Sequence, residues 1–246
     1  MNFGRKGLTR VCHSIQKQPR KENYKKMFSP ELLGIIGLTL RMTLISTFIS
    51  ALIGIPLGFV LEKAVFPGKQ IVVMINRTLM GLPPVVAGLI VYILLRRAGP
   101  FGSFGLLFTL EAMIIAQVLL ITPIICGMVY TATCREGDKI RSFAFTMGAS
   151  RLQTTVLLIK ELKNEIFFFL VAGFGRAMSE VGAIMMVGGN IRFHTRTMTT
   201  AIALEARRGQ FEEAIVLGAL LMLIAVIVQV IGSVLRRKEQ RLDENF

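Results

Sequence analysis

The sequence of 246 residues contains no tryptophan, only two histidines and only three cysteines. Cys12, Cys126 and Cys134 form neither an even set nor a spacing typical of zinc ligands, so no disulfide framework or structural metal site is predicted. Most hydrolytic and metal-dependent chemistries lack their usual residues here. The chain also lacks the phosphate-binding pattern G-x-x-x-x-G-K-[ST], which excludes nucleotide hydrolysis by a P-loop within it.

Charged residues are scarce as well. They make up 18% of the chain, whereas 53% of the residues are hydrophobic and the mean hydropathy is +0.61. A soluble domain of this length is less apolar than this, and a disordered or collagen-like chain has a different composition. The composition therefore indicates a small polytopic membrane protein.

Five apolar stretches are long enough to cross a bilayer, which takes about 20 helical residues. They cover residues 32–61, 71–95, 106–130, 166–189 and 214–235. We predict an all-α membrane domain over residues 29–235, followed by a C-terminal tail over residues 236–246. Ser29-Pro30-Glu31 supplies a helix start for the first stretch, which at roughly 45 Å must tilt or begin in the membrane interface.

The distribution of basic residues predicts how these spans are oriented. Twelve Lys and Arg residues lie in the connection between the first two spans, in the loop over residues 131–165 and in the C-terminal tail. Six lie on the opposite side. Because positive charge is retained in the cytoplasm, the C-terminus and this loop are predicted to be cytoplasmic. An odd number of spans then puts the N-terminus outside.

The basic N-terminal tail over residues 1–28 does not fit this orientation, because it would place many positive charges outside. Residues 1–26 hold eight Lys and Arg residues against the single acid Glu22, and they lack the apolar core of a signal peptide. Met27 directly precedes the helix start, so either translation begins there or the tail is a dispensable extension. Without residues 1–26 the net charge falls from +14 to +7, with 21 basic and 14 acidic residues. Membrane topology accounts for most of that charge, and nucleic-acid binding is not indicated.

The predicted cytoplasmic loop has structure of its own over residues 138–165. Apolar residues recur in it at near-helical spacing, and Gly148-Ala149-Ser150 interrupts them. The pattern predicts a helical elbow, two short helices joined by a sharp turn. Such an elbow fits either a groove on a partner protein or the lipid surface as an interfacial helix, and periodicity alone does not separate the two.

Two charges fall near the middle of the fourth span, where each alone would cost several kcal/mol. Arg176 and Glu180 are four residues apart, so a helix places them on one face, where they neutralise one another. Ser179 lies beside them. In the second span, Pro83-Pro84 removes two backbone donors and predicts a kink or break. That break serves either static packing or a hinge or pathway role. Arg77, in the same span, faces protein or extends to a boundary of the membrane.

Met147-Gly148-Ala149-Ser150-Arg151 resembles the glycine-centred coupling loop of type I ABC importer permeases, the membrane subunits that a separate ATPase drives. The chain departs from that family's pattern at two places. Ser142-Phe143-Ala144 stands where an acidic-Ala-Ala triplet is usual, and Lys160-Glu161 stands where Leu-Pro is usual.

Three further segments resemble the oxyanion branch of these permeases. Residues 66–69 and 82–88 are similar to segments of molybdate and tungstate permeases. Residues 175–183 resemble the Arg-x-x-Ser-Glu signature of that branch, and their continuation through residue 205 is similar to tungstate permeases. The resemblance covers about residues 30–235.

The resemblance implies a type I ABC permease fold in the plasma (inner) membrane, importing tungstate as a homodimer. Its partners would be a second copy of itself, cytoplasmic ATPase subunits that bind ATP and Mg, and an external oxyanion-binding protein, besides membrane lipid. The subunit itself would be non-catalytic and hold no cofactor. Residues 147–151 would couple to the ATPase. Arg176 would attract the dianion unless it serves only a structural ion pair.

On the outside, Arg192 and Arg196 lie in the loop between the last two spans. The resemblance implies that a binding protein docks there, and the two cations would also lower the barrier for an entering oxyanion. A plain solvated loop is the alternative.

Two other functions stay open. A molybdate or sulfate permease shares the same features, because these oxyanions share charge and shape. A self-sufficient secondary transporter is the competitor from another class. Such transporters often contain paired repeats, and the five stretches show no internal repeat.

Overall fold

The computed structural model describes residues 30–243, with side chains as far as residue 234. The basic tail and the alternative start at Met27 lie outside the described residues. Every regular element in the described part is helical, which confirms the all-α prediction. The elements are α3 (Pro30–Lys63), α4 (Lys69–Met80), α5 (Pro84–Leu95), η1 (Gly102–Phe104), α6 (Leu110–Thr146), α7 (Arg151–Glu161), α8 (Lys163–Met178), α9 (Gly182–Gly188), α10 (Met198–Arg207) and α11 (Phe211–Asp243).

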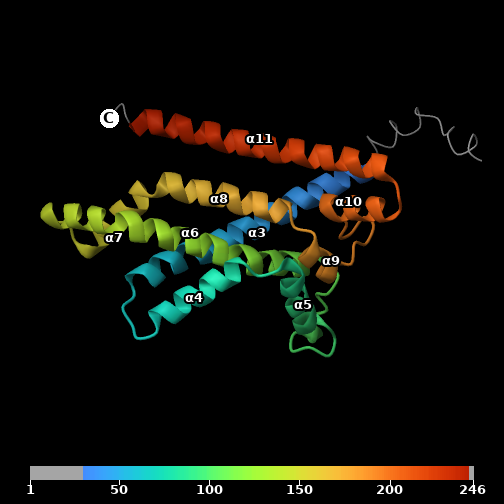
Figure 1. Ribbon diagram of the computed structural model, residues 1–246, viewed down its shortest axis with the longest axis horizontal. Coiled ribbons are helices and arrows are strands. Elements are labelled where there is room, and N and C mark those ends of the chain that lie inside the picture. Colours follow the sequence, from blue (N-terminus) through green and yellow to red (C-terminus); the bar gives the residue numbers. More distant parts are fainter. Residues whose placement is uncertain (1–29, 244–246) are drawn as a thin grey trace, which may run out of the picture.

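Helices α3, α6, α8 and α11 run along the long axis of the molecule, whereas α5 projects across it (Figure 1). Three described helices are long and apolar enough to span a membrane, namely Pro30–Lys63, Leu110–Thr146 and Phe211–Val234. The other two predicted spans are broken pairs. Helices α4 and α5 meet at 102°, and α8 and α9 meet at 59°. The described part therefore has three continuous spans, or five if each bent pair counts as one, and residues 166–189 do not form one continuous helix.

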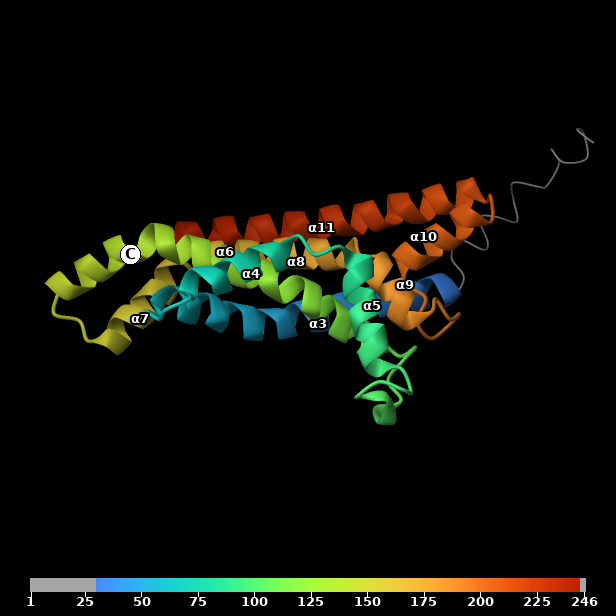
Figure 2. The same cartoon turned by 60° about the horizontal axis from the view of Figure 1, so that its bottom comes forward.

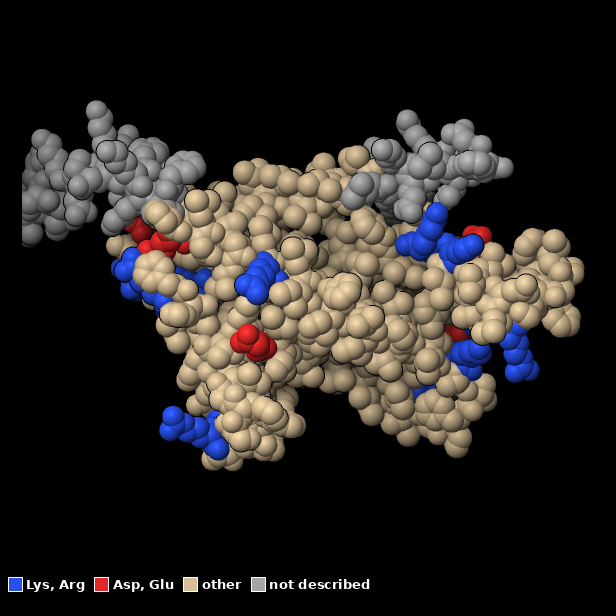
Figure 3. All heavy atoms as spheres, turned by 180° about the vertical axis from the view of Figure 1, so that it is seen from behind, with Lys and Arg blue, Asp and Glu red and all other residues tan. Residues whose placement is uncertain are grey.

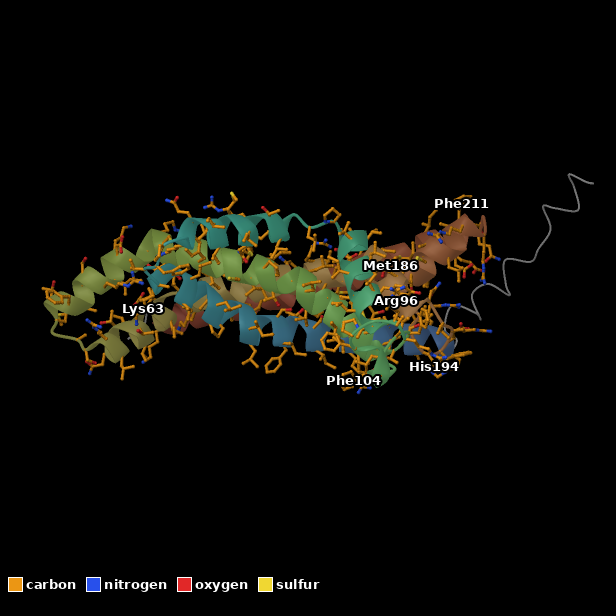
Figure 4. All side chains as sticks on the ribbon, turned by 90° about the horizontal axis from the view of Figure 1, so that it is seen from below. Lys63, Arg96, Phe104, Met186, His194 and Phe211 are labelled. Carbon is orange, nitrogen blue, oxygen red and sulfur yellow. The ribbon has the colours of Figure 1, made fainter. Side chains whose placement is uncertain are left out.

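The two ends of the bundle differ. One end, here called the elbow end, carries α7 and the end of α6, which extend beyond the rest of the bundle (Figure 2). Lys63 lies toward this end, whereas Arg96, His194 and Phe211 lie toward the opposite end, the loop end (Figure 4). On the face seen in Figure 3, most charged side chains gather toward these ends and leave a broad uncharged area between them, as a membrane-spanning chain requires.

Helix α3 packs on α6 through a face of small and hydroxyl-bearing residues. At Gly58 a Cβ atom would lie 2.7 Å from the Val129 Cβ, and at Gly54 it would lie 3.0 Å from the Thr122 carbonyl oxygen. Only glycine therefore permits this approach, which is the usual way for membrane helices to gain close packing. The other small buried residues on this face are Thr39, Thr43, Ser46, Thr47, Ser50 and Ala51.

Gln117 joins three helices at the centre of the bundle. Its side chain is fully buried. The Ser46 hydroxyl of α3 donates to its Oε1 over 2.6 Å, and its Nε2 donates to the Ala177 carbonyl of α8 over 2.9 Å. Both hydrogen bonds are buried, so losing either would leave a buried polar atom without a protein partner.

We predict that Gln117→Met, which keeps the length of the side chain, lowers the free energy of unfolding by about 1–3 kcal/mol, because the Ala177 carbonyl loses its partner. Thermal unfolding of the purified protein in detergent measures the effect. Gln210→Met is the matched control, since Gln210 is exposed. Equal unfolding midpoints for the two variants would show that the Gln117 contacts do not hold the helices together.

Candidate functional site

The elbow predicted around Gly148 is present, and its first arm is the end of the long helix α6. Gly148 has φ +71°, a left-handed conformation that glycine adopts without steric cost. Its N–H donates to the Phe145 carbonyl over 3.0 Å, and the Ala149 N–H donates to the Ala144 carbonyl over 2.9 Å. These two bonds are those of a Schellman motif, so they end α6 and turn the chain.

A capping box starts the second arm, α7. The Gln153 side chain accepts from the Ser150 N–H over 2.8 Å, and the Ser150 hydroxyl accepts from the Gln153 N–H over 3.4 Å. Arg151 is the first residue of this helix. Leu158 and Leu162 are buried against the bundle and anchor the arm.

The outer surface of the elbow is apolar and exposed. Phe145 is 84% exposed, Met147 72% and Leu152 82%. Large apolar side chains this exposed, gathered at a turn that extends past the bundle, mark a surface that another molecule or lipid covers.

Pro83 and Pro84 break the second span, as predicted. Helix α4 ends at Met80, and Pro84 is the first residue of α5, a position where its missing N–H is not needed. The Val86 and Ala87 N–H groups donate to the Pro83 carbonyl over 3.0 and 3.2 Å. The break is therefore a well-formed helix start, and it turns the chain through 102°.

The fourth span breaks at residues 179–181, and Arg176 and Glu180 lie on either side of the end of α8. They form an ion pair over 2.7 Å, from Arg176 Nη1 to Glu180 Oε2. The pair exists as predicted, but Glu180 lies beyond the helix rather than on its face. Ser179 caps α8, and its hydroxyl donates to the Arg176 carbonyl over 2.9 Å.

Glu180 causes the break through contacts outside α8. Its Oε1 accepts from the Ala183 N–H over 3.3 Å, which gives the start of α9 a carboxylate partner. The Thr199 hydroxyl of α10 donates to its carbonyl over 2.9 Å. The Glu180 side chain is 4% exposed and that of Arg176 is 36% exposed. The acid is thus fixed in the protein, while the cation retains an open side.

The two broken spans pack against one another just past their breaks. A Cβ at Gly88 of α5 would lie 2.7 Å from the Ala183 Cα of α9, and a Cβ at Gly182 would lie 2.8 Å from a Val85 methyl group. Helices α5 and α9 therefore form a unit whose two backbones touch. The unit lies toward the loop end, where Met186 of α9 is labelled in Figure 4.

At the loop end, Arg192 and Arg196 share a carboxylate that the sequence did not indicate for this role. Glu31 accepts from Arg192 Nε over 2.8 Å and from Arg192 Nη2 over 2.5 Å, and it lies 3.5 Å from Arg196 Nη1. The Glu31 carboxylate raises the pKa of Arg192 above its ordinary value. Arg196 Nε also donates to the Asn190 side chain over 3.3 Å. Arg196 is thus mostly buried and held from two sides, whereas Arg192 is paired but still 60% exposed.

Residues 54–241 match the family described as binding-protein-dependent transport system inner membrane component. The chain belongs to this family. The tungstate uptake system permease protein TupB of Peptoclostridium acidaminophilum is 41% identical over 204 residues, which are 83% of this chain and 90% of that protein. A probable anion ABC transporter permease protein of Haloferax volcanii is 38% identical over 207 residues, 82% of this chain and 89% of that protein.

The fold of this permease agrees with that of solved ABC importers. An inward-facing MetNI methionine ABC transporter superposes with a TM-score of 0.63 over 85% of this chain and 95% of that chain, at 21% sequence identity. As a permease of this family, the chain is a multi-pass protein of the inner membrane. It works with an ABC ATPase and a substrate-binding protein.

The geometry of the permease leads to a prediction about its intramembrane pair. Arg176→Met leaves the buried Glu180 charge without a cationic partner, so we expect a loss of about 3–5 kcal/mol of stability. Glu180→Gln costs less, because its amide oxygen still accepts from Ala183 and Arg176 keeps an open side. Thermal unfolding of both variants in detergent checks the order. Greater destabilisation by Glu180→Gln would contradict the asymmetry described above.

Proposed function

We propose that this permease imports tungstate as a homodimer, with the translocation pathway between its two copies. The 41% identity to a tungstate uptake permease over most of both chains carries the proposal. An external oxyanion-binding protein delivers the dianion. The ATPase binds ATP and Mg and drives the cycle, and the permease is its non-catalytic membrane part.

The elbow supports coupling to the ATPase. Its exposed apolar residues Phe145, Met147 and Leu152 lie around a turn whose backbone Gly148 fixes, and Leu158 anchors the second arm in the core. A rigid apolar tip of this kind fits a groove on a partner protein, because docking there loses little conformational entropy. The elbow end is then cytoplasmic, as the count of basic residues predicts.

Arg176 supplies the attraction for the anion within the membrane. Its side chain is 36% exposed although its partner Glu180 is buried, and the neighbouring Gly175 and Ser179 are exposed too. A cation with an open side next to a small residue and a hydroxyl group lets a dianion approach. Because Glu180 competes with the dianion for Arg176, the dianion is held only transiently and is then released.

At the loop end, Arg192 and Arg196 remain net positive after pairing with the single carboxylate of Glu31. This excess of positive charge favours an entering oxyanion and meets the binding protein at the outer mouth.

We expect cells that carry this gene to take up tungstate in preference to molybdate when each competes with the other, and to lose that uptake when ATP is depleted. Cells without the gene are the control. Equal uptake of molybdate or sulfate would support an ABC permease with a different substrate. Gene-dependent uptake that continues without ATP would support a secondary transporter instead.

Leu152→Glu is expected to reduce ATP-driven uptake about tenfold or more without reducing the amount of folded protein, because the side chain is 82% exposed and contributes to docking rather than to the core. Leu152→Met is the matched control, because it keeps an apolar side chain of similar size at the same exposed position. Uptake and permease-stimulated ATPase activity are measured together. Full stimulation by Leu152→Glu would place the coupling contact elsewhere.

A further inference from the structure

A hollow of about 520 Å³ lies between α4 and α6, away from the Arg176–Glu180 pair. It is lined by Lys69, Gln70, Val73, Met74 and Arg77 of α4 and by Tyr130 of α6. The polar groups in this lining are two cations, an amide and a phenol, so hydrogen-bond donors predominate.

The positive charge of this hollow is not cancelled by a carboxylate. Glu62 lies nearby, but it accepts hydrogen bonds from both terminal nitrogens of Arg141 and is occupied by them. Lys69 donates to the Glu62 backbone carbonyl over 2.5 Å. This bond positions the ammonium group, but a neutral carbonyl does not neutralise its charge. Among the described side chains, no carboxylate forms a salt bridge with Lys69 or Arg77.

The hollow runs along α4 from its first turn, where Lys69 lies, to its last turn, where Arg77 lies. Helix α4 begins at Lys69, has no acidic residue in its first turn and receives no side-chain cap. A cation at this end opposes the helix dipole, whereas an anion is stabilised there. Lys69, Val73 and Arg77 recur every four residues, so one face of α4 carries both cations.

The hollow is preformed, because α4 is fixed to α6 beside it. Asn76 Nδ2 donates to the Pro123 carbonyl over 3.2 Å. Gly127 leaves room for the Met80 sulfur, which would lie 2.5 Å from a Cβ at that position. A wall that is already fixed and carries donors lowers the entropic cost of holding a ligand.

We propose that this hollow binds a tetrahedral oxyanion at the elbow end of the permease, with Arg77 and Lys69 as its charged contacts and Tyr130 and Gln70 as neutral donors. The shared chemistry is a tetrahedral group of anionic oxygens. The ligand is either the transported oxyanion as it leaves the pathway for the cytoplasm, or a phosphate group, free or in a lipid headgroup. That the transported oxyanion is tungstate rests on the proposed function.

The test uses the complete transporter, permease with its ATPase, in nanodiscs of phosphatidylcholine without nucleotide or binding protein. Equilibrium dialysis with tungstate, counted by elemental mass spectrometry, gives the affinity, and phosphate serves as competitor. Arg77→Gln and Lys69→Gln should each weaken binding about tenfold or more, since each removes a charge-assisted hydrogen bond. Lys63→Gln, an exposed lysine at the same end that does not line the hollow, should bind like the unsubstituted protein.

A second arm adds phosphatidylglycerol to the nanodiscs and measures which lipids remain bound after detergent extraction. Retention of this lipid that Arg77→Gln abolishes, with weak tungstate binding throughout, supports the oxyanion site and identifies a headgroup as its ligand. Arg77→Lys keeps the charge and should retain part of the binding. If Arg77→Gln and Lys69→Gln bind tungstate, phosphate and phosphatidylglycerol like the unsubstituted transporter, the proposal is overturned.

Failure of the site and failure of the proposed substrate give different results. Cells without gene-dependent tungstate uptake, combined with weakened oxyanion binding by Arg77→Gln, would remove tungstate as substrate and keep the site. Gene-dependent tungstate uptake, combined with unchanged binding by Arg77→Gln, would remove the site and keep the substrate.

Discussion

Gln117 fixes the end of α8, the point at which the fourth span breaks. Its buried amide accepts from Ser46 of α3 and donates to the Ala177 carbonyl near the end of α8. A bilayer offers no water to replace these bonds, so the three helices keep one relative position at this level. The end of α8 is thereby fixed from α6, and with it the place where Glu180 leaves the helix and starts α9. Together with the Ala183 and Thr199 contacts of Glu180, this buried amide sets the geometry of the intramembrane ion pair.

Features with a local cause could be predicted from the sequence, and those with a distant cause could not. Pro84 breaks the second span by its own covalent structure, and Gly148 turns the elbow because it adopts a left-handed conformation. The break at residues 179–181 contains no proline. It forms because the Glu180 carboxylate takes the Ala183 N–H and because Thr199, from another helix, holds the Glu180 carbonyl. Glu31 and Arg192 are 161 residues apart, and no periodic pattern links them.

The distribution of ion pairs suits a chain that handles anions. Glu31, Glu62 and Glu180 each face an arginine of the same chain, so these acids are neutralised inside the protein. Basic residues exceed acidic ones by 14 over the whole sequence. Arg77 and the open side of Arg176 thus remain available for ligands, while these three acids are already paired. The same pairs that stabilise the fold therefore also shape its electrostatic potential.

Helix α3 has an ion pair at each of its ends. Glu31 joins it to Arg192 at the loop end, and Glu62 joins it to the elbow-bearing helix α6 through Arg141. Its 34 residues span about 50 Å. One continuous helix, tied at both ends by ion pairs, therefore links the loop end of the bundle to its elbow end.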